Sequence, residues 1–416
     1  MSRYKGIRKL INDIHLWLGL ASGLVLFVVC LSGTIYTFHT EVEEWLNKDK
    51  FFVAAPANAT RLPVDVLVPK LEQQLKGKIA SLEIPAAENR TLKAVVKADK
   101  KKKMPASEVP AQPSKAKKEG GSDRGKTYYI NPYTGEVTGT EKGRGVDFFT
   151  TMMKLHRWLL IEGDAGKIIV GSATIIFVLL CLSGLVLWFP KRLKHWKQGF
   201  KIKASGNWKR TNHDLHNTLG FYALIFLVIM GLTGLCWSFE WYRNGVSSVM
   251  GAEVFKGRKE KPLPSQIAGT KERIPFSQAL AAAQVAFPYE GNVRVAFPQG
   301  DTGSFVIAKF RTGFFALSAQ DKIQIDQYSG ATLKVDRFAD KPLNVQIVDS
   351  IRPLHLGEFT GTSSKVIWFL CCLIATSLPV TGTMIWLNKM KKKPRKKKPL
   401  PLLKEKSSTA PVLESA

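Results

Sequence analysis

Apolar residues are concentrated in four windows of this chain, and polar segments separate the windows. Each window runs for about 20 residues or more with almost no charge, which is the length that a helix needs to cross roughly 30 Å of hydrocarbon. Buried helices of soluble proteins seldom run this long without a charge, so that alternative is disfavoured. We expect membrane-spanning helices in Leu16–Phe38, Ile168–Phe189, Leu219–Phe239 and Val366–Leu387.

The polar segments after the first and third windows have the pattern of small α+β domains. Each contains one stretch of helical periodicity, two strand-like stretches and a glycine suited to a hairpin turn. In the first segment these are Leu62–Leu75, Ser81–Ile84, Thr91–Lys97 and Gly135. In the second they are Pro275–Phe287, Val293–Phe297, Ser304–Phe310 and Gly330. Residues 99–126 are rich in Lys, Pro, Ser and Gly without periodicity, which predicts a disordered insertion.

The two halves of the chain repeat the same landmarks. A histidine stands at the start of the first and third windows, and the separation from this histidine to a later Ser-Gly or Thr-Gly pair is identical in the two. A Leu-His pair precedes the second and fourth windows, and its separation from the Ser-Gly or Thr-Gly pair of that window differs by one residue between the two. The landmarks are His15 and Gly33 with His216 and Gly234, and His156 and Gly184 with His355 and Gly382. We therefore expect an α-helical polytopic membrane protein with four transmembrane helices from two repeats and two small α+β domains.

Positive charge gathers in the short flanks of the windows and sets the expected orientation. The net charge is +28. The flanking cations are Arg3, Lys5, Arg8 and Lys9, then Lys191, Arg192, Lys194, Lys197, Lys201 and Lys203, and finally the run from Lys389 to Lys398. With four spans all three groups fall on one side, which the positive-inside rule makes cytoplasmic together with both termini. Attraction to anionic lipid explains this charge, so we expect no nucleic-acid partner.

The expected division of the chain follows from these windows and flanks. It is 1–14 cytoplasmic, 15–39 first span, 40–150 first periplasmic domain, 151–166 interfacial segment, 167–189 second span, 190–212 basic cytoplasmic loop, 213–239 third span, 240–352 second periplasmic domain, 353–364 interfacial segment, 365–388 fourth span and 389–416 basic cytoplasmic tail. The first span is long and Ser32-Gly33-Thr34-Ile35-Tyr36 is a poor cleavage site, so we expect an uncleaved anchor.

Cysteine usage excludes several cofactor and cross-link classes. The five cysteines all fall inside the windows, which excludes disulfides between the extramembrane domains. The chain has no CxxCH motif, so covalently attached c-type haem is excluded, and no cysteine spacing suits zinc or an iron–sulfur cluster.

Six of the seven histidines lie at or near the ends of the spans. His15, His213 and His216 fall at the cytoplasmic rim, His39, His156 and His355 at the opposite rim, and His195 in the basic loop. Haem b needs two axial imidazoles that face each other in an apolar pocket of a helix bundle. The repeat-equivalent pairs, His15 with His216 and His156 with His355, therefore predict two b-type haems whose iron these histidines bind.

Two further histidines are second choices, and other interpretations stay open. His213 lies one helical turn from His216, while His39 shares the opposite rim, although its repeat equivalent is Glu240. An interfacial histidine can also simply anchor a helix among head groups. Zinc is less favoured because no carboxylate or cysteine joins these histidines at suitable spacing. The glycines of the Ser/Thr-Gly pairs indicate close helix packing, or leave room for a porphyrin face.

These motifs together resemble a known family. The His-x-Trp-x-Gly opening at His15, Leu155-His156-x-x-Leu and the turn Asn131-Pro-Tyr-Thr-Gly135 are similar to the PepSY-associated transmembrane family, sometimes called iron-regulated membrane proteins. The resemblance covers nearly the whole chain except the insertion and the tail. It implies a four-helix core with periplasmic PepSY-type domains, and a haem-b ferric-siderophore reductase of the bacterial inner membrane.

Three functional hypotheses follow from these observations. The first is transmembrane electron transfer through two haems b to a periplasmic acceptor, a ferric siderophore or another iron chelate. The chain has no nucleotide-binding motif, so its electron donor is a quinol or a partner protein. The second is a membrane-tethered PepSY module that regulates, inhibits a peptidase or binds a ligand without redox activity. The third, a siderophore permease, is disfavoured by few intramembrane ionisable residues and no broken helix.

Overall fold

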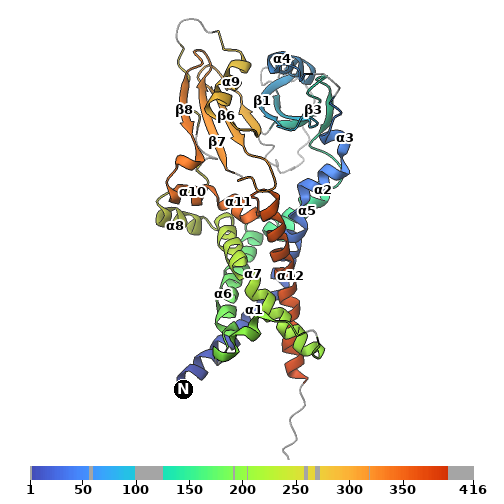
Figure 1. The fold of residues 1–416 in the computed structure, drawn as a ribbon, viewed down its shortest axis with the longest axis vertical. Helices are drawn as coiled ribbons and strands as arrows, with labels where there is room; N and C mark the ends of the chain where they lie inside the picture. Colours follow the sequence, from blue (N-terminus) through green and yellow to red (C-terminus); the bar gives the residue numbers. More distant parts are fainter. Residues whose placement is uncertain are drawn as a thin grey trace, which may run out of the picture.

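The computed structural model describes residues 2–55, 60–98, 125–190, 193–203, 205–256, 261–267, 272–317 and 319–391, with the side chains of 2–5, 98 and 193–195 excepted. The expected insertion, apart from residues 125 and 126, and the expected tail beyond residue 391 lie outside these residues, as does the side chain of His195. The described chain forms a bundle of long helices with a β-sheet above it (Figure 1).

Within the described residues, four helices are long and apolar enough to cross a membrane, as expected from the windows. They are α1 (Ser2–Tyr36), α6 (Ala165–Trp188), α7 (Trp208–Ser238) and α12 (Thr362–Met390). The protein is therefore a multi-pass membrane protein. Each helix packs on two others in the order α1, α6, α7, α12 and back to α1, so α1 and α7 stand diagonally opposite.

The ends of the spans differ from the expected ones. Helix α1 stops at Tyr36, short of the predicted end at residue 39, and His39 starts the separate helix α2 (His39–Leu46). The Nδ1 atom of His39 lies 2.9 Å from the carbonyl oxygen of Tyr36, so the ring donates to a carbonyl near the end of the helix. Helices α1 and α7 also begin well before their apolar windows, which places His15 and His216 inside helices.

The part above the bundle is one antiparallel sheet of eight strands. They are β1 (Gly77–Ile84), β2 (Leu92–Ala98), β3 (Lys126–Ile130), β4 (Val137–Thr140), β5 (Asn292–Ala296), β6 (Ser304–Phe310), β7 (Gln320–Asp326) and β8 (Thr332–Asp336). Their order across the sheet is β4-β3-β2-β1-β5-β6-β7-β8. The predicted strands are therefore present, and β3 starts at Lys126, inside the range expected for the insertion.

The two expected domains are joined, which the sequence did not predict. Strand β1 pairs with β5, with Ser81 opposite Ala296 and Ile84 opposite Val293. Without this pairing each half would present an open strand edge, whose unpaired backbone groups invite association. The halves also share one apolar core, which helices α4 (Val64–Leu75) and α9 (Phe276–Ala286) help to form.

Both predicted hairpin glycines lie in turns that require them. Gly135 and Gly330 have positive φ angles of 75° and 70° in the β3–β4 and β7–β8 turns. The turns begin with side chains that accept from the backbone two residues later: Asn131 from the amide of Tyr133 at 2.9 Å, and Asp326 from the amide of Tyr328 at 2.8 Å. Such side-chain bonds stabilise the turn in both hairpins.

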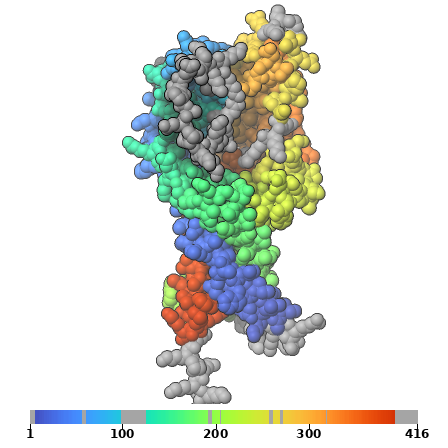
Figure 2. Space-filling model, turned by 180° about the vertical axis from the view of Figure 1, so that it is seen from behind, coloured from blue at the N-terminus to red at the C-terminus, as the bar shows by residue number. Residues whose placement is uncertain are grey.

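Short helices connect the sheet to the bundle (Figure 1). Besides α2 they are α3 (Lys48–Phe51), α5 (Val146–Trp158), α8 (Glu240–Met250), α10 (Leu343–Asp349) and α11 (Ile351–Leu356), with the 3₁₀ helix η3 (Phe338–Asp340). A second 3₁₀ helix, η1 (Leu193–Phe200), lies between α6 and α7 at the end of the bundle far from the sheet. A buried Lys365 at the start of α12 binds Glu41 of α2 at 2.8 Å. Figure 2 shows the resulting shape, a wide sheet part on a narrower bundle in which α1 and α12 lie side by side.

Candidate functional site

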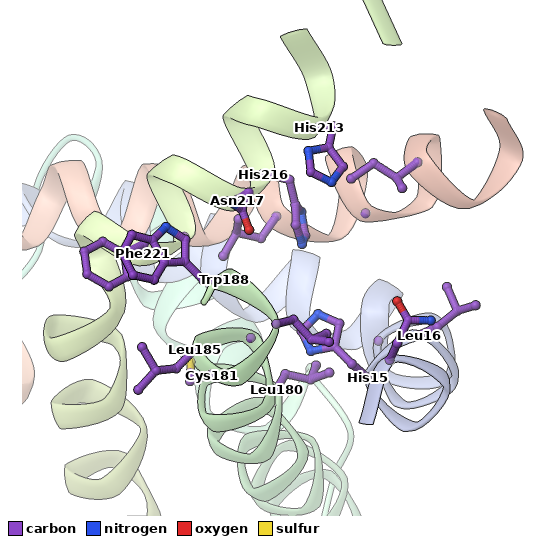
Figure 3. A pocket seen from close by; sticks show the side chains of 18 of the residues that line it. His15, Leu16, Leu180, Cys181, Leu185, Trp188, His213, His216, Asn217 and Phe221 are labelled. Carbon is purple, nitrogen blue, oxygen red and sulfur yellow. The ribbon is translucent and has the colours of Figure 1, made fainter. Parts of the chain in front are cut away.

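Two histidines face each other at the end of the bundle far from the sheet. His15 lies on α1 and His216 on α7, and their ring centres are 6.4 Å apart with the ring planes at 90° (Figure 3). Because α1 and α7 are diagonally opposite, both rings point into the space between the four helices. The structure thus brings together the first predicted pair.

Hydrogen bonds fix which nitrogen of each ring carries the proton. His15 Nδ1 lies 2.8 Å from the hydroxyl oxygen of Ser183, whose own proton goes to the carbonyl of Leu179 at 2.7 Å. The serine oxygen must therefore accept from Nδ1–H, which leaves Nε2 of the neutral ring with a free lone pair. His216 Nδ1 has the same relation to Thr381 at 2.9 Å, because that hydroxyl donates within its own helix.

A second pair of histidines lies at the sheet end of the bundle. His156 on α5 and His355 on α11 have ring centres 6.1 Å apart and planes at 51°. His156 Nδ1 lies 2.8 Å from the carbonyl oxygen of Val29, and His355 Nδ1 lies 3.1 Å from that of Met230. A carbonyl can only accept, so both Nδ1 atoms donate and both Nε2 atoms keep a free lone pair.

Burial keeps this second pair uncharged. It lowers the pKa of His156, and burial together with the neighbouring His156 lowers the pKa of His355 to about 4. A metal binds the neutral imidazole, so no proton has to leave these rings at neutral pH before a metal binds.

Each of the four rings lies against a glycine of the Ser/Thr-Gly pairs. A methyl group on any of these glycines would come within 3.5 Å of Cε1 of the ring. The contacts are Gly33 with His156, Gly234 with His355, Gly184 with His15 and Gly382 with His216. The glycines therefore make room for imidazole rings, a role that the sequence did not separate from helix packing or space for a porphyrin.

At the sheet end the glycines also leave open the backbone carbonyl groups that accept hydrogen bonds from the histidine rings. Gly33 follows Val29 by one helical turn, and Gly234 follows Met230 by one turn. A side chain one turn later shields the carbonyl of the earlier residue from neighbours outside the helix. Its absence allows His156 and His355 to reach those carbonyls.

A cavity of about 1340 Å³ surrounds the pair of His15 and His216. Its walls come from all four spans and are largely apolar, with Leu26, Leu180, Phe221 and Ala375 among them. Trp188 stacks on Phe221 at 3.8 Å at the side away from the histidines (Figure 3). Cofactor pockets usually measure about 300–1,000 Å³, so the space is large enough for a flat macrocycle.

The mouth of the cavity carries positive charge. Its lining includes Arg8, Lys9, Arg210 and Lys389, and also Asp214, which forms an ion pair with Arg210 at 2.9 Å. Arg8 donates to the carbonyl of Leu187 at 2.6 Å, at the end of α6. An apolar interior with a cationic mouth suits an amphiphile whose ionised groups are anionic.

The two second-choice histidines do not join either pair. His213 lines the cavity, but its side chain is 58% exposed and its Nδ1 lies 3.7 Å from Asp214. His39 stacks on Tyr36 at 3.9 Å, while the pair at that end is formed by His156 and His355.

The distance between the ring centres in each pair, 6.4 Å and 6.1 Å, is compatible with two imidazoles on one metal. Two imidazoles that bind opposite sides of one metal at about 2.0 Å have ring centres about 6 Å apart. Among the described residues no three or more His, Cys, Asp or Glu side chains are grouped to hold a metal ion. A metal held here by two imidazoles must therefore bring its other ligands, as the iron of a porphyrin does.

Sequence reasoning missed the partners of these rings. The carbonyls of Val29 and Met230 have no side-chain signal, and the contact of Trp237 with His355, at 5.2 Å between ring centres, depends on how α7 is rotated. The Ser/Thr-Gly pairs were the available signal, since both Ser183 and Thr381 precede the glycine that the ring touches.

The family model described as the PepSY-associated TM region matches residues 13–389. No curated protein matches the chain.

Proposed function

This chain belongs to the PepSY-associated TM region family, and we propose that it transfers electrons across the membrane through two b-type haems. The observation that carries the proposal is the pair of imidazole rings at each end of the bundle, 6.4 Å and 6.1 Å apart between ring centres. Each pair takes one histidine from each half of the chain. All four rings have Nε2 free to bind iron.

The two halves are, in this proposal, degenerate copies of one unit with a PepSY-like domain in each. The element order supports this. Helix α4 and strands β1 to β4 are followed by α5 and α6, just as α9 and β5 to β8 are followed by α10, α11 and α12. Each histidine–glycine contact within the first half has a counterpart within the second half, between elements at equivalent places in the element order.

The proposed location is the bacterial inner membrane, with the sheet in the periplasm and both termini in the cytoplasm. The basic flanks support this orientation. Lys201, Lys203 and Lys389 all lie near the ends of spans at the end far from the sheet. The positive-inside rule makes this end cytoplasmic.

His15 and His216 would hold one haem, and His156 and His355 the other. When bound, haem b supplies a carrier of single electrons at each end of the bundle. Ser183 and Thr381 keep Nδ1 of the first pair protonated and so aim Nε2 away from these hydroxyls. Arg8, Lys9 and Lys389 in the cavity lining offer positive charge to anionic groups at the cytoplasmic end, while Arg210 is paired with Asp214.

The acceptor that we propose is a ferric siderophore or another iron chelate on the sheet side. One electron converts its Fe(III) to Fe(II), which binds hard oxygen ligands more weakly, so iron leaves while the chelator stays intact. The electron donor is a quinol or a partner protein, because the sequence has no nucleotide-binding motif.

The test is a visible spectrum of the purified chain with haem content by pyridine haemochrome. We expect two haems per chain with bis-imidazole spectra, and reduced protein that is reoxidised by ferric chelate. Replacing His15, His216, His156 or His355 with Ala should remove about one haem of the two.

The matched controls are the two histidines outside the pairs. His39→Ala and His213→Ala should keep both haems. A full haem complement in His156→Ala and His355→Ala would contradict the ligands at the sheet end. A chain without any chromophore after expression in haem-replete cells would favour a regulatory PepSY module or a permease.

A further inference from the structure

Helices α8 and α10 project sideways from the base of the sheet, beyond the outline of the bundle (Figure 1). Helix α8 follows α7 with Phe239 between them, and the ring of Phe239 packs against Gly171 of α6. Gly171 lies more than one turn inside α6, which begins at Ala165. Phe239 is therefore at the depth where the spans end, and α8 starts at the membrane surface.

One face of this helix pair is anchored to the protein. Tyr242 and Val246 of α8 pack with Val348 and Ile351 in a small apolar core under the sheet. The side-chain amide of Asn344 on α10 donates to the carbonyl of Met250 at 2.8 Å. The two helices thus form one platform with a fixed orientation.

The other face of the platform carries large exposed apolar side chains, beside exposed polar residues such as Glu240, Asn244 and Ser248 on α8. On α8, Trp241 and Val249 lie two turns apart on one stripe and are 64% and 87% exposed. On α10, Leu343 and Ile347 lie one turn apart and are 72% and 43% exposed. Water is a poor solvent for such large exposed apolar side chains, and Trp is enriched where a protein meets the membrane interface.

A third segment, the loop between β6 and β7, reaches the same level from another part of the chain. Phe314 and Phe315 in this loop are 55% and 77% exposed. The carbonyl of Phe314 accepts from the amide of Ser363 at 3.0 Å, which holds the loop at the first turn of α12. Both aromatic rings therefore lie where α12 enters the membrane.

We propose that the platform and this loop rest in the lipid interface of the leaflet on the sheet side, with these six apolar side chains among the lipids. The occupant is lipid because the stripes continue the exposed apolar surface of the spans. Ile168 and Ile169 on α6, and Val366 and Ile367 on α12, are exposed at the same end of the bundle.

This contact would fix the depth of His355, one member of the second histidine pair. Helix α10 is followed by Ser350 and then by α11, which carries His355. A platform held in the interface fixes the depth of α11. The inference does not depend on haem or on electron transfer.

The experiment compares two equally exposed valines on two helices. Val249→Cys on α8 and Val285→Cys on α9, where Val285 is 82% exposed, are each labelled with a nitroxide in the full chain. The chain is then placed in phosphatidylcholine nanodiscs, and power-saturation EPR measures accessibility to oxygen and to a water-soluble nickel chelate. The same labelling and measurement on the wild-type chain give the signal from its five native cysteines, which is subtracted.

We expect an oxygen-to-nickel ratio several-fold higher at position 249 than at position 285, because oxygen concentrates in lipid and the chelate in water. The same high ratio should appear for Phe315→Cys, from the independent loop. A ratio at 249 equal to that at 285 would overturn the proposal, since the stripe would then face water. Low accessibility to both reagents would overturn it as well, because a second copy or another protein would cover the stripe.

Discussion

At the residue scale, the hydroxyl partners of His15 and His216 decide which nitrogen can bind a metal. Ser183→Ala removes the acceptor of His15 Nδ1, which lies 2.8 Å away. We expect haem affinity at that end to fall about 10–100-fold, because partners of this kind fix the ring orientation and tautomer. Haem titration of the apoprotein measures the loss.

Ser183→Thr is the matched control for this change. Threonine keeps the hydroxyl, and the equivalent position in the other half, Thr381, is itself a threonine that binds His216. Wild-type affinity in Ser183→Ala would show that Ser183 does not orient His15.

The glycines that contact the rings make a second test. A methyl group at Gly33 would lie 2.9 Å from Cε1 of His156, and one at Gly234 would lie 3.0 Å from Cε1 of His355. Nδ1 of each ring donates a hydrogen bond to a backbone carbonyl. A ring displaced by the methyl group must therefore break this hydrogen bond or move away from the other histidine of the pair. We expect Gly33→Ala and Gly234→Ala to lose the haem at the sheet end, measured as haem per chain.

The control is Gly6→Ala, where a methyl group would have no neighbour within 4 Å. This variant should keep both haems. Alanine also raises helix propensity by about 1 kcal/mol relative to glycine, so a weakened helix would not explain a loss at Gly33. Unchanged haem content in both variants would contradict the contact.

At this scale the sequence predicted which histidines form pairs but not how they are held. The prediction paired His15 with His216 and His156 with His355 from their matching positions in the two halves, and the structure brings each of these pairs together. The sequence could not predict which carbonyl groups accept from the rings, since a backbone oxygen is present at every residue and its availability depends on helix rotation.

At the scale of elements, hydrophobic patterning predicted the helices and strands well and their neighbours poorly. Ser304–Phe310, predicted as a strand, is β6 with the same ends. The seam between β1 and β5 had no sequence signal, because alternation shows which face of a strand is buried but not which strand lies beside it. Glu83 and Arg294, an ion pair of 2.9 Å across that seam, are common types on any surface.

The β2–β3 hairpin predicts the effect of removing the insertion. Val96 pairs with Lys126, so the segment between these strands leaves and re-enters the sheet at the same end. Deleting Lys100–Gly121 shortens that connection without touching either strand. We expect the melting temperature to stay the same or rise slightly, because a shorter loop costs less closure entropy.

Thermal unfolding and haem content of the deletion variant check this expectation. Removing residues 93–97 of β2 serves as the contrasting deletion, because Ala94 and Val96 are buried in the core of the sheet and their loss should abolish folding. A large drop in melting temperature on deleting Lys100–Gly121 would show that the segment packs on the described fold.

At the scale of the whole molecule, the bundle and the sheet predict a defined topology. Reporter enzymes active only in the periplasm should work when fused at Gly121, between β2 and β3, and fail at Ser407, beyond α12. The described part of the chain supports this, since the last span ends at the end of the bundle opposite the sheet. Equal reporter activity at the two positions would refute the orientation.

The pairing of histidines across the two halves makes each half insufficient by itself. Each proposed cofactor requires one imidazole from either side of the loop between α6 and α7, and β1 needs β5 as its neighbour. Cutting the chain in that loop and producing the fragments together should therefore restore the chromophore by complementation, while either fragment alone stays colourless. If the proposed function holds, the chain would bind its redox-active iron only after both halves have folded against each other, so a half-synthesised or misfolded chain would carry none.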